Sequence, residues 1–242
     1  MRQLTLTLLL CILLKFSAWA QLEGAWKLTY DDVQSVSGRE MVAIFSDNYF
    51  MFSNYYDDGR FIGAGGGAYR LDGGELHLTY DFYTDDASIV RVPQTYTIRL
   101  NKEEFTINGS ISNTDFTQKW EKIDEEQNAL SAAWRFGTRV DEDGNIGEIR
   151  EVGPRQTIKI LGGGRFQWAA FNYETKDFRG TGGGTYKLDN GTYTEQIEFF
   201  SRDDSRVGNS LSFQFERKGD SWFHKGKSSK GDPLHEVWKI ID

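Results

Sequence analysis

Cysteine, proline and histidine are scarce in this 242-residue sequence, which has one Cys, three Pro and three His. One cysteine cannot form a disulfide within the chain, so the class of small disulfide-stabilised domains is excluded. Basic residues are outnumbered, since 28 Lys and Arg face 36 Asp and Glu and give a net charge of −8. Nucleic-acid-binding domains need a basic surface to neutralise phosphates. We therefore expect no nucleic acid partner.

The only long apolar run lies at the N-terminus, where residues 4–14 follow a basic residue and precede an Ala-x-Ala sequence that ends at Ala20. This order is typical of a secretory signal peptide, which we place at 1–20. A membrane anchor and lipidation at Cys11 are the alternatives. A spanning helix needs about 20 apolar residues and Lys15 interrupts this run, while Cys11 lies inside the run rather than after it. We expect an exported protein, periplasmic or secreted, with no stable membrane insertion after signal cleavage.

An internal repeat divides the rest of the sequence. Three segments recur in the same order, with 22–27 similar to 130–135, 61–72 similar to 178–189, and 120–124 similar to 238–242. Such a repeat indicates two tandem domains. We place them at 21–124 and 130–242, joined by a polar linker at 125–129, and expect each to fold independently. The second repeat is longer near 141–145, which predicts an extended surface loop there.

Within each repeat the apolar residues recur with a period of two, in runs separated by Gly, Asn and Asp. This pattern predicts an all-β fold with about eight strands per repeat. Eight sequential strands joined by hairpins avoid exposed edges by closing into an up-and-down antiparallel barrel, although a β-sandwich is an alternative. The glycine-rich segments 63–67 and 180–184 continue as strands, so we interpret them as bulges or sharp bends and not as phosphate-binding loops.

A Gly-x-Trp sequence, Gly24-Ala25-Trp26, begins the first predicted strand, and its second copy ends in Trp134. With a Gly-x-Trp motif at the start of the first strand of a barrel, the sequence resembles the lipocalins. Residues 182–186, 193–195, Trp222 and 236–239 are also similar to a family of lipocalin-like (calycin) secreted bacterial domains of uncharacterised function. The resemblance implies a barrel that encloses a small molecule.

Corresponding positions of the two repeats predict which side chains share a face, because alternate residues of a strand point to the same side. Leu76, Leu78, Tyr80 and Phe82 correspond to Tyr193, Glu195, Ile197 and Phe199. In the same way, His224 stands where the first repeat has Ile107, and Glu236 where it has Gln118. The comparison predicts three polar side chains inside the second barrel. An isolated buried carboxylate is costly, so they need mutual partners or water.

We interpret this cluster as the polar part of a ligand pocket in the second barrel. The expected ligand-binding residues are Glu195, His224, Glu236, Tyr193, Trp222, Trp168, Phe213 and Trp238. The first barrel, filled by Leu76, Leu78, Ile98 and Ile107, would then be mainly a scaffold. The sequence therefore predicts an exported protein that binds a small, partly apolar molecule.

Several alternatives remain open for the same residues. The cluster can be a structural network or lie in water at a barrel mouth, and two Glu with one His can hold a divalent metal. Glu195 and His224 can serve as the base and acid of an isomerase or hydrolase. A surface module that binds glycans or proteins is favoured by exposed aromatic loops such as 54–57. We expect no cofactor, and no haem at His224, because Glu195 and Glu236 would crowd the propionates.

Overall fold

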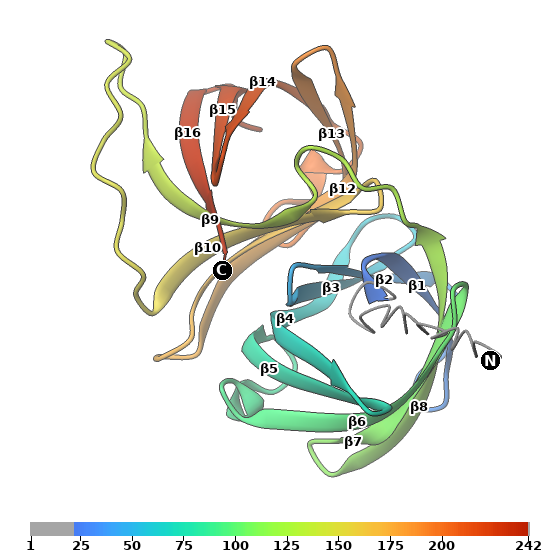
Figure 1. The fold of residues 1–242 in the computed structure, drawn as a ribbon. Helices are drawn as coiled ribbons and strands as arrows, with labels where there is room; N and C mark the ends of the chain where they lie inside the picture. The colour runs from blue at the N-terminus through green and yellow to red at the C-terminus, as the bar shows by residue number, and fades with distance from the viewer. Residues whose placement is uncertain (1–21, 242) are drawn as a thin grey trace, which may run out of the picture.

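The computed structural model describes residues 22–241, so the signal peptide expected at 1–20 lies outside the described residues. The fold is all-β and contains two closed eight-stranded antiparallel barrels in tandem (Figure 1). The first barrel consists of β1 (Gly24–Asp31), β2 (Arg39–Ser46), β3 (Tyr49–Tyr56), β4 (Phe61–Asp72), β5 (Glu75–Tyr83), β6 (Pro93–Leu100), β7 (Glu104–Ile111) and β8 (Thr114–Asp124). The expectation of up-and-down barrels is confirmed, because each strand pairs with its neighbours in the sequence and β1 closes on β8.

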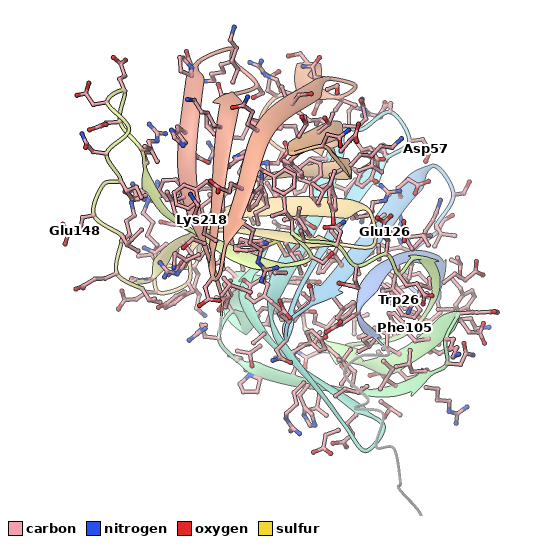
Figure 2. All side chains as sticks on the ribbon, turned by 45° about the horizontal axis from the view of Figure 1, so that its top comes forward. Trp26, Asp57, Phe105, Glu126, Glu148 and Lys218 are labelled. Carbon is pink, nitrogen blue, oxygen red and sulfur yellow. The ribbon has the colours of Figure 1, made fainter. Side chains whose placement is uncertain are left out.

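The second barrel repeats this topology. It consists of β9 (Ala132–Arg139), β10 (Arg155–Gly162), β11 (Arg165–Asn172), β12 (Asp177–Asp189), β13 (Thr192–Phe200), β14 (Ser210–Lys218), β15 (Ser221–Lys227) and β16 (Pro233–Ile240). A short 3-10 helix follows β5 in the first barrel and β13 in the second, at Ala87–Ile89 and Asp204–Arg206. The long segment 140–154 between β9 and β10 carries an isolated antiparallel bridge between Val140 and Ile146, as expected for the extended loop. Figure 2 shows Glu148 of this segment on the outside of the second barrel.

The two tryptophans at the barrel starts occupy equivalent places. Trp26 and Trp134 are fully buried, and each indole Nε1 donates a hydrogen bond to the carbonyl four residues earlier, at 2.7 Å to Leu22 and 2.8 Å to Leu130. Gly24 has a positive φ of 117°, and a Cβ there would lie 2.6 Å from the Asp124 carbonyl oxygen. The Gly-x-Trp sequence therefore closes one end of the barrel.

The glycine-rich strands contain the bulges that the sequence indicates. The register shifts between Gly66 and Gly67 in β4 and between Gly183 and Gly184 in β12. At each bulge the opposite strand reverses its inward and outward faces. Phe82 thus points out of the barrel, although the period of two places it inside with Leu76, and Phe199 does the same in the second barrel.

The outward phenylalanines belong to an apolar interface between the barrels. β2 to β5 face β10 to β12 (Figure 1), and the Phe82 and Phe171 rings stack with centroids 5.1 Å apart. The Tyr55 hydroxyl of the first barrel donates to Glu198 Oε2 of the second at 3.0 Å. The two barrels therefore pack together through outward-facing side chains, which include the phenylalanines that the bulges turn outward. No helix among residues 22–241 is long and apolar enough to cross a membrane.

Candidate functional site

A cavity of about 310 Å³ occupies the first barrel. Its inner part is lined by Phe45, Phe105 and Trp120, close to the end that Trp26 closes, and the Trp26 and Phe105 rings meet at 4.8 Å (Figure 2). Its other end is lined by residues of the loops at 32–38, 84–92 and 112–113. The cavity thus runs from the closed end of the barrel to the loops at the opposite end.

The walls of the cavity are mostly apolar and aromatic. The side chains that carry this character include Ala43, Phe50, Phe52, Leu76, Leu78 and Ile107. Most of them are buried in the same cluster as Trp26, so the walls are fixed by the core of the barrel. This composition is typical of a site for a small, largely apolar molecule.

A buried ion pair fixes one side of the cavity mouth. Arg39 Nη2 lies 3.1 Å from Asp31 Oδ2, and the two side chains are only 8% and 6% exposed. The Asp31 carboxylate also accepts hydrogen bonds from Gln118 Nε2 and from the backbone N–H groups of Val33 and Gln34. Arg39 Nε donates to the Ser35 carbonyl at 2.7 Å. Both charges are therefore used to hold the loop after β1 against the barrel.

Three polar atoms of the cavity wall, Asn54 Oδ1, the Tyr96 hydroxyl and Trp120 Nε1, have no hydrogen bond within the described residues, and two of them concern a ligand here. Asn54 Oδ1 and Trp120 Nε1 are buried and have no hydrogen-bond partner within the described part of the chain. A buried polar atom that lacks a partner destabilises a protein by about 1–3 kcal/mol. Both atoms are thus free to pair with a polar group of a bound molecule.

The polar cluster expected in the second barrel is present there. Glu195, His224 and Glu236 are buried inside it, as the comparison of the repeats predicts. Lys159, which the sequence analysis missed, is the partner of Glu195, with Nζ 2.6 Å from Oε1. The Tyr193 hydroxyl donates to the same oxygen at 2.8 Å.

Lys159 could have been identified from the repeat. Trp26 pairs with Ala43 in the first barrel, and Trp134 pairs with Lys159 in the second. Since Ala43 lies in the first core, the equivalent lysine must point into the second barrel. The missed signal is therefore a lysine at an inward position.

The ammonium of Lys159 fills the centre of the second barrel. Its Nζ lies 5.5–5.6 Å from the centroids of four rings, Phe166, Tyr193, Trp222 and Trp238. Such contacts between a cation and aromatic faces are favourable when the cation is desolvated. The space that the sequence analysis assigned to a ligand is taken by this side chain and its aromatic neighbours.

His224 and Glu236 form the second part of the cluster. His224 Nδ1 lies 3.8 Å from Glu236 Oε2, and Trp238 Nε1 donates to that oxygen at 3.1 Å. Burial lowers the pKa of His224 below its ordinary value. Burial alone raises the pKa of Glu236, but His224 and the charge of Lys159 together lower it by more, so the net shift is downward.

The other expected residues also lie in the second barrel. Phe213 packs on His224 with ring centroids 3.9 Å apart, and Trp168 is half-buried beside Phe200 at the edge of the cluster. No group of three or more His, Cys, Asp and Glu side chains among residues 22–241 is arranged to hold a metal ion. Ligand binding by the eight expected residues stays a prediction, whereas the large cavity lies in the barrel that we expected to be a scaffold.

Comparisons with known proteins identify no family. No family model matches the sequence, and no curated protein matches it. Among solved structures, the chain is similar to the uncharacterised protein YLR301w from Saccharomyces cerevisiae, with 12% identity and a TM-score of 0.47 over 91% of this chain and 98% of that chain.

Proposed function

We propose that the protein binds a small, largely apolar molecule inside the first barrel. The observation that carries this proposal is the cavity of about 310 Å³, at the lower end of the ~300–1,000 Å³ common for small-molecule sites. A ligand that covers the apolar walls removes their surface from water, which contributes about 25 cal/mol per Å² to binding. Asn54 and Trp120 supply the few polar contacts that orient such a ligand.

The contrast between the two barrels supports the choice of the first. In the second barrel, Lys159 stands in place of Ala43 and Glu195 in place of Leu78, and their ion pair crosses the interior. Glu195 is already bound by Lys159 and Tyr193, so we do not propose it as a catalytic base. The second barrel then serves as the support against which the first barrel packs.

We propose further that binding takes place after export. This part rests on the signal-like order of residues 1–20 and on the lipocalin-like Gly-x-Trp at Trp26. A chain that has lost Cys11 with the signal contains no thiol, so it tolerates an oxidising compartment.

The proposal can be tested with the uncharged fluorescent probe N-phenyl-1-naphthylamine. Saturable binding to the protein without residues 1–20 is expected. Leu78→Trp and Ile107→Trp each place an indole in the cavity and should weaken binding about tenfold or more. Leu188→Trp, at a half-buried position of the second barrel, is the matched control and should bind the probe normally. Unchanged binding by both cavity variants would contradict the proposal.

A further inference from the structure

The mouth of the first-barrel cavity is acidic. Three carboxylates, Asp31, Asp85 and Asp86, and one guanidinium, Arg39, line the cavity. Asp31 and Arg39 neutralise each other in their ion pair. Hydrogen bonds from Ser112 and Ser88 lower the pKa of Asp86, which keeps it ionised, and Lys176 lies near enough to contribute to that shift. The remaining charge at the mouth is therefore negative.

Asp85 has no counter-ion among the described residues. No Lys, Arg or His within residues 22–241 forms an ion pair with it, and its Oδ1 accepts only from the Thr84 hydroxyl at 3.0 Å. Burial raises the pKa of the neighbouring Tyr83, and the charge of Asp85 raises it further. Tyr83 therefore stays a neutral phenol beside an unpaired negative charge.

Asn54 and Asp85 are both neighbours of Gly63 in β4. Asn54 pairs with Gly63 in the β3–β4 register, and a Cβ at Gly63 would lie 2.8 Å from Asp85 Oδ1. Asn54 is 8% exposed, and its Oδ1 can only accept a hydrogen bond. The side chain of Asn54, with an unpartnered acceptor, and the carboxylate of Asp85 are thus both adjacent to Gly63 in the cavity wall.

Aromatic rings line the cavity next to these two acceptors. The Phe52 and Tyr83 rings lie 6.0 Å apart, and Gly65 leaves the space that both occupy, since a Cβ there would lie 2.9 Å from Tyr83 Cδ2. Aromatic faces attract organic cations as well as apolar groups. Acceptors at the mouth and rings below them match one kind of molecule, an apolar body with a positively charged nitrogen.

The second barrel has the opposite character at the same place. By register, Ala170 stands where the first barrel has Asn54, and Arg202 where it has Asp85. Gly180, the equivalent of Gly63, faces the Arg202 guanidinium instead of a carboxylate. Equivalent hydrogen bonds hold both positions, since the Ala64 N–H donates to the Thr84 hydroxyl and the Thr181 N–H to the Ser201 hydroxyl, so the fold accepts either charge there. A carboxylate at this position is thus a property of the first barrel alone.

We propose that the ligand of the first barrel is an organic amine, with its ammonium between Asn54 and Asp85 and its apolar body in the aromatic cavity. This inference rests on the proposed function of the same cavity. A carboxylate ligand would face Asp85 and Asp86, and the one guanidinium in the wall is already held by Asp31 and Ser35. An amine instead supplies a hydrogen-bond donor to the Asn54 oxygen and a positive counter-charge to Asp85.

Three probes of similar size separate the inference from the proposed function. These are 2-phenylethylamine, 2-phenylethanol and 3-phenylpropionate, tested by displacement of N-phenyl-1-naphthylamine at neutral pH. The amine should bind more tightly than the alcohol, and the acid most weakly. If the alcohol binds as well as the amine, or the acid binds best, the amine inference is wrong while the cavity proposal stands. If none of the probes binds, including the naphthylamine, both are wrong.

Variants identify the residues responsible. Asp85→Asn should weaken the amine about threefold to tenfold, the effect of one charge contact at a partly solvated site, and leave the alcohol unchanged. Asp85→Arg copies the second barrel and should reverse the preference towards 3-phenylpropionate. Asp58→Asn removes a carboxylate that pairs with Arg60 outside the cavity. As the matched control, it should change neither the affinity for the amine nor the affinity for the alcohol. An amine affinity unaffected by both Asp85 variants would overturn the assignment.

Discussion

Lys159 and Glu195 form an ion pair in the middle of the second barrel, with 2.6 Å between Nζ and Oε1 and side chains that are 7% and 6% exposed. The equivalent positions of the first barrel hold Ala43 and Leu78, which line a cavity. Two substitutions between the repeats thus change the interior from a space to a filled polar core. The same topology supports both interiors because the wall is built by backbone pairing.

Removing one partner of this pair should destabilise the protein strongly. Lys159→Met leaves an uncompensated carboxylate inside the barrel and should lower the free energy of unfolding by about 3–5 kcal/mol. The double variant Lys159→Met with Glu195→Leu restores an apolar interior and should recover most of that loss. Urea denaturation measures both. A loss below ~1 kcal/mol in the single variant would show that water reaches the carboxylate.

The barrel-closing tryptophans should contribute equally. Trp26→Ala and Trp134→Ala each remove a fully buried indole and its hydrogen bond, so we expect each to lower the free energy of unfolding by about 3–5 kcal/mol. Thermal and urea denaturation of the two variants give the comparison. A change under ~1 kcal/mol in either would indicate that the indole does not close its barrel.

Acidification should destabilise the protein through His224. Because burial lowers the pKa of His224 in the folded state, the unfolded state binds the proton first as the pH falls below about 6.5. The contribution of neutral His224 to the free energy of unfolding is complete above that pH. It decreases below that pH by at most about 1.4 kcal/mol per pH unit. His224→Ile, which copies Ile107 of the first barrel, should make the free energy of unfolding, measured by urea denaturation, less dependent on pH between about pH 7.5 and 5.5.

Two other groups define the control for this measurement. The pKa of Glu236 is also lowered in the folded state, but its stability contribution is lost only as the pH falls below about 4.5. His235 has a lowered pKa from burial and from Lys225, but it is only half-buried whereas His224 is fully buried, so His235→Ala should leave most of the pH dependence in place. An unchanged pH dependence in His224→Ile would contradict the assignment.

The second barrel should fold without the first, since it closes its own sheet and has its own core. An isolated chain of residues 128–242 would expose Ile158, Ile160 and Phe171 of the interface, so we expect it to self-associate. Phe171→Lys should reduce the association, as sedimentation would show. A disordered NMR spectrum of this chain would instead mean that the two halves share one core.

Much of this architecture can be predicted from the sequence. The repeat and the period of two give both barrels, and the comparison of equivalent positions correctly turns Glu195, His224 and Glu236 inward. The outward turn of Phe82 cannot be predicted from the sequence, because a bulge reverses the faces within a strand whose residues still alternate between apolar and polar. The position of a bulge depends on pairing with the neighbouring strand and not on local composition.

The cavity itself is harder to predict. Its volume is what remains after side chains from all eight strands have packed, and small differences such as Ala43 against Lys159 decide it. Lysine in the apolar run 158–161 resembles a solvent-facing residue until the strand pairing places it opposite Trp134. The equivalence of Asp85 and Arg202 was visible in the sequence, but its meaning depends on knowing which barrel is hollow.

Methyl NMR of the protein without residues 1–20, during titration with 2-phenylethanol, shows whether a small molecule occupies the first barrel. We expect saturable shifts of the Leu78, Ile107 and Ala43 methyl groups, which line the cavity, and no shifts for Ile197 and Leu188 of the second barrel. Shifts confined to Ile197 and Leu188, or no saturable shift in the first barrel, would contradict the proposed function.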